Sequence, residues 1–427
     1  MKTRARAWTI WGSAAFVYAV AMLNRVALSA AALQAGDRFH ISAAQLGLLP
    51  AAQFVVYFLM QVPAGMLADG WGPRRTLAAG ASLIGLGAFV LAAAHQLPYA
   101  LLGRLLTGLG DSLIFVNVLR LQASWFPPKR YATLSGLTGL SGSLGQMLGA
   151  APLAALLASA GWSGSFSALG LLTLGSALLA LAVVRDRPAP VSPSAPATAI
   201  EGRSPWGDVL RNPGTWTAFA AHLGLFAPFL VFSTLWGYPY LVQVYRLRPV
   251  EAGVLLSACA LAYMLSGLIL GWLSDHRSDR TFALYLAGAL GTTGWLLMAL
   301  WPGARLPEPL LVSAVAAVGA GGAGALGAIA IAKDANRPEA AGLATGVANV
   351  GGFAGGALLQ LVVGFLLDTS SGPAASHLYD PRAYQHAFLV VGLCCVGALA
   401  VAMGLFRHGA RVALHLTRSD ARQSLDV

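Results

Sequence analysis

The chain has 427 residues, of which 57% are hydrophobic and 10% are charged, and its mean hydropathy is +0.68. A soluble domain carries about 25% charged residues, so this composition excludes a soluble globular protein and predicts an integral membrane protein. The net charge of +11 does not indicate nucleic acid, because the basic residues lie mainly in short loops on one side of the apolar segments. That asymmetry is the orientation signal of a membrane protein.

Twelve segments are apolar over about the 20 residues that a membrane-spanning helix needs. The first is longer than the apolar core of a signal peptide and has no convincing cleavage site, so we interpret it as the first span. The spans are expected at 9–33, 43–68, 77–95, 98–124, 132–159, 163–184, 215–241, 250–274, 281–301, 308–332, 341–367 and 384–407.

The segment 185–213 interrupts this series between the sixth and seventh spans. Its composition is that of a linker without a core of its own, with prolines at Pro188, Pro190, Pro193, Pro196, Pro205 and Pro213. We therefore expect an all-α protein with twelve transmembrane helices in two pseudo-symmetric six-helix bundles. The domains are expected at 1–184, with the linker over 185–213, and at 214–427, which ends in a short tail.

The distribution of lysine and arginine predicts the orientation. With the amino terminus placed inside, 19 basic residues fall in inside segments and 5 in outside loops. Basic residues are enriched in cytoplasmic loops, so both termini and the linker are expected in the cytoplasm and the protein in a cytoplasmic membrane. The five outside are Arg38, Arg246, Arg248, Arg305 and Arg382.

Ionisable residues inside the spans are the candidate functional residues, because a charge in hydrocarbon usually faces a cavity or a partner. Asp111 stands near the middle of span four, and Arg104, seven residues earlier, shares its helix face at about 10 Å along the axis. Arg25 lies in the outer half of span one, directly after Asn24. Asn117 lies nearer the cytoplasm on span four.

Two interpretations of these charges remain open. Arginine binds a carboxylate with two hydrogen bonds and keeps its charge, so two arginines and one titratable acid suit a cavity for an anion and a proton. Alternatively, an aspartate–arginine pair holds helices together permanently. Arg120 is expected to extend to the cytoplasmic interface. His222 in span seven is expected to be a hydrogen-bonded packing residue rather than a proton relay.

A charged turn occurs twice in the chain. The sequence Gly65-Met-Leu-Ala-Asp69-Gly-Trp-Gly72-Pro-Arg74-Arg75 returns in weaker form as Gly271-Trp-Leu-Ser-Asp275-His-Arg-Ser-Asp279-Arg280, and each copy separates two apolar runs. In this feature the chain resembles the major facilitator superfamily over its whole length. The resemblance implies that the turn is a cytoplasmic gate, with Gly65, Asp69, Gly72, Arg74, Asp275 and Arg280 as gating residues and with Asp69 capping a neighbouring helix.

A finer resemblance is to the anion:cation symporters of that superfamily. Span one carries Asn24-Arg25, span four carries Arg104, Asp111, Asn117 and Trp125-Phe126-Pro127 in the family's order, and span seven ends in Trp236-Gly-Tyr238-Pro239-Tyr240-Leu241. The resemblance implies that Arg25 and Arg104 hold a substrate carboxylate and that Asp111 takes the coupling proton. Polar contacts are expected from Asn24, Asn117, Tyr238, Tyr240 and Asn349.

Two departures leave the coupling open. Asn24 replaces the family's aspartate, and Asp111 is one methylene shorter than the family's glutamate, so uniport or exchange are alternatives to symport. The sequence of span five, Gly145-Gln-Met-Leu-Gly149-Ala-Ala-Pro152, lacks the Gly-Pro dipeptide that is typical of drug exporters.

The expected function is secondary active transport of a small organic anion by alternating access, with a proton as the co-transported ion. Efflux of a drug or metabolite by proton antiport is the alternative. An enzyme is not expected, because no Ser/His/Asp arrangement or metal spacing is present, and Cys259, Cys394 and Cys395 all lie inside spans. The expected partners are the small-molecule substrate, H⁺ and membrane lipid, with no cofactor and no nucleic acid. The family resemblance implies a monomer.

Overall fold

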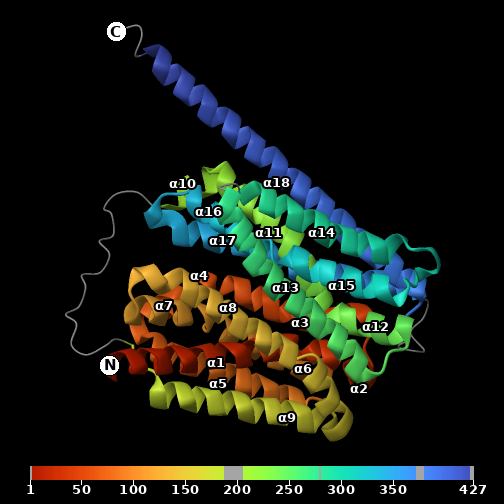
Figure 1. The fold of residues 1–427 in the computed structure, drawn as a ribbon. Helices are drawn as coiled ribbons and strands as arrows, with labels where there is room; N and C mark the ends of the chain where they lie inside the picture. Colours follow the sequence, from red (N-terminus) through yellow and green to blue (C-terminus); the bar gives the residue numbers. More distant parts are fainter. Residues whose placement is uncertain (1, 187–204, 278–279, 372–378, 424–427) are drawn as a thin grey trace.

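The structure is a computed structural model that describes residues 2–186, 205–277, 280–371 and 379–423. Helices connected by short turns form almost all of this part of the chain, as the long apolar runs predict. In Figure 1 the helices form two halves, the first coloured red to yellow and the second green to blue. The predicted all-α membrane fold is confirmed.

Within the described residues, the first half contains nine α-helices. Their bounds are α1 Lys2–Ala30, α2 Ala32–Phe39, α3 Ala43–Leu59, α4 Gln61–Trp71, α5 Pro73–Ala93, α6 Leu97–Ser112, α7 Phe115–Trp125, α8 Tyr131–Leu148 and α9 Ala151–Val183, with a 3₁₀ turn at Pro128–Arg130. Three spans are each built from two consecutive helices: α3 with α4, α6 with α7, and α8 with the first part of α9.

The second half follows the same plan. Its helices are α10 Pro205–Arg211, α11 Pro213–Val231, α12 Gly237–Tyr245, α13 Pro249–Arg277, α14 Arg280–Leu300, α15 Glu308–Gly322, α16 Ala325–Asp334, α17 Ala341–Ser371 and α18 Pro381–Gln423. A π-helical turn, Phe232–Trp236, joins α11 to α12 within one span, and 3₁₀ turns lie at Pro302–Ala304 and Pro338–Ala340.

The described helices account for the twelve predicted spans. Ten stretches are long and apolar enough to cross a membrane, or eleven when the bent pair of α2 and α3 is counted as one span. One stretch, Thr133–Val183, has 51 residues and is kinked at Gly161, where φ is 66°. Glycine adopts this left-handed conformation at little cost, and about 50 helical residues are long enough to cross a ~30 Å hydrocarbon core twice.

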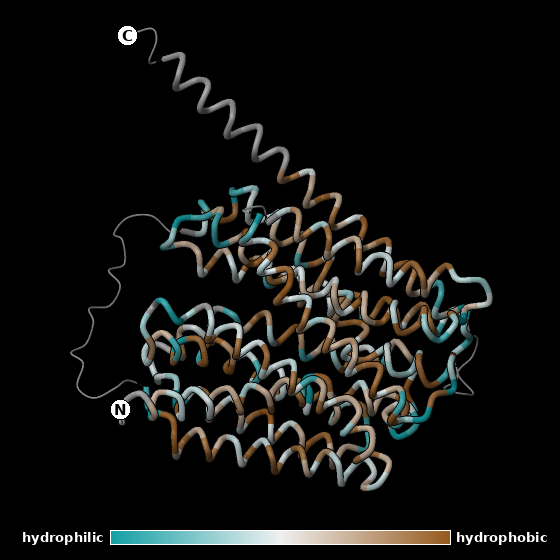
Figure 2. The backbone as a smooth tube through the Cα atoms, in the orientation of Figure 1, coloured by the Kyte–Doolittle hydropathy of each residue, from teal (hydrophilic) through white to brown (hydrophobic). Residues whose placement is uncertain are grey.

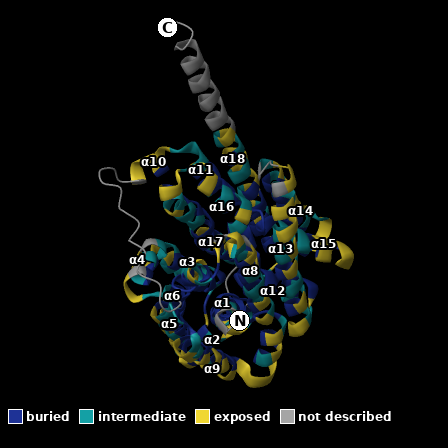
Figure 3. Ribbon diagram, turned by 60° about the vertical axis from the view of Figure 1, so that its left-hand side comes forward, coloured by how far each residue is buried: buried dark blue, intermediate teal, exposed yellow. Residues whose placement is uncertain are grey.

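The surface of the bundle has the pattern of a membrane protein. Large apolar side chains are exposed on its outside, including Leu171, Leu178, Leu358 and Phe365. Figure 2 shows hydrophobic colour along the helices and hydrophilic colour mainly in the connecting turns, and Figure 3 shows the most buried residues towards the middle of the bundle. Exposed leucine and phenylalanine on spans are expected where the surrounding solvent is lipid.

The two halves meet chiefly at the end that the orientation signal places outside. There α3 packs against α17, and α8 and α9 pack against α13. The Asp368 carboxylate near the end of α17 accepts hydrogen bonds from the backbone N–H groups of Ala43 and Ala44, each at 2.8 Å. A carboxylate from one half thus caps the first turn of a helix in the other half. At the opposite end, the main packing contacts of α7 and α16 lie within their own halves.

The predicted linker is partly helical. Residues 205–211 form α10, and Val209 on it is fully buried in the apolar core of the second half. One buried valine therefore anchors the end of a segment that its proline content marks as a linker. Residues 187–204 lie outside the described residues.

Candidate functional site

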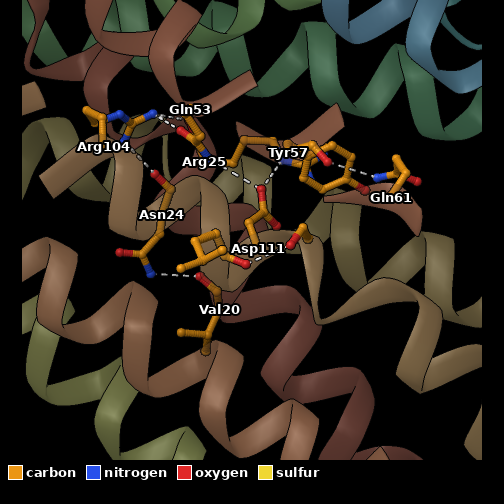
Figure 4. A network of polar contacts seen from close by, with 10 residues as sticks. Val20, Asn24, Arg25, Gln53, Tyr57, Gln61, Arg104 and Asp111 are labelled. Atoms are coloured by element: carbon orange, nitrogen blue, oxygen red, sulfur yellow. Dashed lines mark hydrogen bonds and ion pairs between the residues drawn. The ribbon is translucent and has the colours of Figure 1, made fainter. Parts of the chain in front are cut away.

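A cluster of polar side chains occupies the middle of the first half, close to the boundary with the second. Arg25 comes from α1, Gln53 from α3, and Arg104 and Asp111 from α6. Figure 4 shows the four side chains converging between these helices. Each lies within an apolar run and each is buried, so their polar groups depend on one another for hydrogen bonds.

Arg25 and Asp111 form an ion pair. The Arg25 Nε atom donates to Asp111 Oδ2 at 2.8 Å, and the two side chains are only 8% and 2% exposed. Gln53 Nε2 donates to the same oxygen at 3.3 Å. The second oxygen, Asp111 Oδ1, is buried and has no hydrogen-bond partner within the described part of the chain. One carboxylate oxygen therefore accepts two hydrogen bonds while the other accepts none from the described residues.

Arg104 is held by a different set of acceptors. It donates to Gln53 Oε1, and at 3.4 Å to each of the backbone carbonyls of Asn24 and Arg25. The Arg104 side chain is among the largest fully buried side chains in the protein. The expected placement of Arg104 and Asp111 on one helix face is seen, but Asp111 pairs with Arg25. Arg104 instead fixes the backbone of α1 beside the pair.

Gln53 reaches the cluster because α3 and α6 approach closely at Gly108. A Cβ atom added at Gly108 would lie 2.5 Å from the Gln53 carbonyl oxygen. Small residues at helix contacts allow such close approach in membranes. The glycine on span four therefore sets the distance at which the Gln53 amide bridges Arg104 and Asp111.

Asn24 faces away from the ion pair. Its Nδ2 donates to the Val20 carbonyl and to Thr173 Oγ1, each at 2.9 Å. These contacts join α1 to α9. The amide at the family's aspartate position thus serves as a packing contact in this structure.

Aromatic rings cover the other side of Arg25. Its guanidinium carbon lies 4.9 Å from the centroid of the Tyr57 ring and 5.3 Å from that of the Phe353 ring, which comes from α17 in the second half. The two rings are 4.2 Å apart. One helical turn before Phe353, Asn349 Nδ2 donates to Gln61 Oε1 at 3.3 Å, again across the two halves. The ion pair therefore lies directly beside the surface that the second half presents.

The other candidate residues lie elsewhere. Asn117 is buried and donates to the Leu113 carbonyl of its own span at 2.7 Å. The hydroxyl groups of Tyr240 and Tyr245 lie 3.3 Å apart within the second half. Tyr238 is buried in the same apolar cluster, and no described contact joins it to Arg25. The structure thus brings together Arg25, Arg104, Asp111 and the backbone of Asn24, with Asn349 nearby. It does not bring Asn117, Tyr238 or Tyr240 into this cluster.

Arg120 and His222 each show a detail that the sequence analysis did not specify. Arg120 donates to the Gly65 carbonyl at 3.1 Å, which attaches α7 to α4. His222 is buried beside Phe226, with ring centroids 4.9 Å apart, and its Nδ1 has no hydrogen-bond partner among the described residues. The expected hydrogen bond is therefore not seen on that nitrogen, and His222 packs mainly through its ring.

The predicted gating turn includes a cap that the sequence did not reveal. Gly72 has a φ of 78°, and the N–H of Arg74 donates to Asp186 Oδ1 at 2.6 Å. The Arg74 guanidinium donates to the Leu181 carbonyl at 2.5 and 3.0 Å. The carboxylate of Asp186, at the end of span six, thus caps α5. The side chains of Asp69, Asp275 and Arg280 lie outside the described residues.

Several residues of the site were not predicted from the sequence. Gln53, Tyr57, Phe353 and Asp368 were not singled out. Gln53 carried a usable signal, because an amide in the middle of an apolar span needs a partner. No metal-type cluster of three or more His, Cys, Asp or Glu side chains is found in the part of the chain that the structure describes.

Comparisons with known proteins agree with this architecture. The sequence model of the Major Facilitator Superfamily matches residues 14–305 and 237–424. The fold is similar to that of a bacterial homologue of the human lysosomal transporter Spinster in an inward-facing, unoccupied conformation. The TM-score is 0.74 with 16% sequence identity, and the match covers 96% of this chain and 98% of the other.

Several of the similar sequences belong to proteins named as transporters of anions or sugar acids. The chain is 25% identical over 395 residues to the probable anion transporter 4, chloroplastic, of Oryza sativa. The match covers 85% of this chain and 64% of the rice protein. It is 27% identical over 383 residues to the probable galactarate/D-glucarate transporter of Escherichia coli, with 82% and 86% covered. A hexuronate transporter of Bacillus subtilis is 28% identical over 180 residues, 42% of each chain.

Proposed function

The chain belongs to the Major Facilitator Superfamily, and from this premise we propose that it carries a small organic anion across a cytoplasmic membrane together with a proton. The observation that carries the proposal is the buried Arg25–Asp111 pair beside the boundary between the halves. The names of the relatives, which include anion, galactarate/D-glucarate and hexuronate transporters, support the anionic substrate.

The pair suits an exchange of partners. When Asp111 is charged, it holds Arg25 through Nε and competes with any substrate carboxylate for the guanidinium. A proton that binds to Oδ1 of Asp111 removes the negative charge, so Arg25 is free to bind the anion. Loss of the proton restores the ion pair and displaces the anion. Proton binding and anion binding therefore favour one another.

Arg104 has a positioning role in this mechanism. Its two terminal nitrogens donate to Gln53 and to the carbonyls of Asn24 and Arg25, while its Nε has no partner among the described residues. Through the terminal nitrogens Arg104 orients α1 and keeps Gln53 against Asp111. Arg25 is the residue that contacts the substrate. Asn349, one turn from Phe353, supplies a polar contact from the second half.

Alternating access is the mechanism by which the two halves move. In major facilitator proteins the halves rock about a site between them. The contacts through Asp368 close the end placed outside, whereas at the other end the main packing contacts of α7 and α16 lie within their own halves. In this proposal the conformation is an inward-facing state, both termini lie in the cytoplasm, and a single chain is the working unit.

Uptake into proteoliposomes tests the proposal. Purified protein is supplied with a panel of radiolabelled organic anions, organic cations and neutral solutes under an inward proton gradient. We expect accumulation of at least one organic anion, its loss in Arg25→Gln, and normal uptake in the control Arg382→Gln, which changes an exposed arginine. Accumulation of cations or neutral solutes alone, or anion uptake unaffected by Arg25→Gln, would contradict the proposal.

A further inference from the structure

The charged residues of the transport site all come from the first half. In the six stretches of the second half that are apolar enough to span a membrane, every Asp, Glu, Lys and Arg stands among the first or last three residues. The first half contributes Arg25, Arg104 and Asp111 from the interiors of its spans. A substrate between the halves therefore meets a cation on one side only.

The surface that the second half presents to Arg25 is aromatic. Phe353 lies 5.3 Å from the guanidinium, and the Phe226 ring is 5.4 Å from that of Phe353. Phe226 continues to Tyr263 at 6.5 Å, and Tyr263 stacks on Phe229 at 4.5 Å. Phe226 and Tyr263 are only partly buried, so they are less enclosed by protein than Phe353.

This asymmetry limits the chemistry of the substrate. A second carboxylate at the far end of the substrate would face phenylalanine rings and would remain without a partner, which is costly away from water. A row of hydroxyl groups would meet the same rings, and an unpaired hydroxyl lowers affinity strongly. A flat apolar body gains contacts with the rings.

We propose that the substrate is an aromatic monocarboxylate, with its carboxylate on Arg25 and its ring against Phe353 and Phe226. This inference rests on the proposed function. The proposed function places the carboxylate of the anion on Arg25, and the inference adds that the rest of the anion is aromatic. Few polar groups stand near the rings, and one of them, the His222 imidazole, lies 4.9 Å from Phe226. The Asn349 amide and the Tyr263 hydroxyl suit one polar ring substituent, as in sites where few polar groups orient an apolar ligand.

A binding series on the full chain in lipid nanodiscs tests the inference. The probes are benzoate and phenylacetate, the hydroxylated monocarboxylate glucuronate, the dicarboxylate glucarate and the neutral benzamide. Dissociation constants are measured by calorimetry for the wild type, Arg25→Gln and Phe353→Leu. The matched control is Phe365→Leu, because Phe365 lies on the same helix and is 60% exposed on the outer surface.

We expect the aromatic carboxylates to bind at least tenfold more tightly than glucuronate and glucarate in the wild type. Arg25→Gln abolishes this binding, and benzamide does not bind. Phe353→Leu weakens benzoate roughly two- to tenfold, the range expected when one ring–ring contact is lost, and Phe365→Leu leaves it unchanged. The wild-type ranking tests the inference even where a variant fails to fold.

Two outcomes overturn different statements. Tighter binding of glucuronate or glucarate that still requires Arg25 overturns the aromatic substrate and leaves anion transport intact. Binding of no anion, or anion binding that persists unchanged in Arg25→Gln, overturns the proposed function and the aromatic substrate with it.

Discussion

The contact between Asp368 and the first turn of α3 makes testable the closure of the end that we propose faces outside. Replacing Asp368 with alanine removes two hydrogen bonds of 2.8 Å between its carboxylate and backbone N–H groups. Loss of a helix N-cap costs roughly 0.5–2 kcal/mol, and the charged acceptor places this case near ~2 kcal/mol. At about 1.36 kcal/mol per tenfold change, the balance between closed and open outer ends shifts about 30-fold. An equilibrium near 1:99 would become roughly 1:3.

The distance between spin labels at Gln34 and Glu308 measures this shift. Both positions are exposed, on α2 of the first half and α15 of the second, and the three native cysteines are replaced beforehand. We expect Asp368→Ala to add a population with a longer distance. Asp380→Ala is the control, because the Asp380 carboxylate accepts the N–H of Arg382 at 2.7 Å within one half. Identical distance distributions for Asp368→Ala and wild type, or an equal shift in the control, would refute the reasoning.

Two further substitutions test the packing of the site. Gln53→Leu removes the bridge between Arg104 and Asp111, and we expect the apparent affinity for the transported anion to fall about tenfold, since hydrogen bonds to charged groups contribute roughly 1.5–3 kcal/mol; unchanged uptake kinetics would exclude Gln53 from the site. Gly108→Ala places a Cβ atom 2.5 Å from the Gln53 carbonyl oxygen and should lower the melting temperature, because overpacking costs roughly 1–3 kcal/mol. Gly175→Ala, at a helical glycine with open space around it, should leave that temperature unchanged or raise it, and equal melting temperatures for the two variants would contradict the close approach.

The sequence predicts the fold well because a bilayer leaves few alternatives. Apolar runs of span length must form helices that satisfy their own backbone groups, and the half-chain repeat of the charged turn indicates two similar halves. The kink at Gly161 separates two spans, although in the sequence only a few residues separate one apolar run from the next. The helix α10 was not predicted, since its stability depends on Val209 entering a core that distant residues form.

The site was predicted in part, for a physical reason. Arg25 and Asp111 stood out because charges within spans are rare and need partners. Which arginine pairs with Asp111 depends on how α1, α3 and α6 pack, and that follows from close contacts such as the one at Gly108. Phe353 and Asp368 act across the two halves, at sequence distances that no local pattern spans. From the sequence alone, Phe353 resembles an ordinary packing residue and Asp368 resembles an ordinary charged residue at the end of a span.

Proton-driven accumulation by Asp111→Asn tests the central claim most directly. Proteoliposomes are given an inward proton gradient of about one pH unit, which for one proton per monovalent anion supports roughly tenfold accumulation. We predict that the wild type approaches this ratio, whereas Asp111→Asn exchanges internal for external anion but accumulates none. Accumulation by Asp111→Asn equal to that of the wild type would contradict the account and leave the Arg25–Asp111 pair as a structural contact.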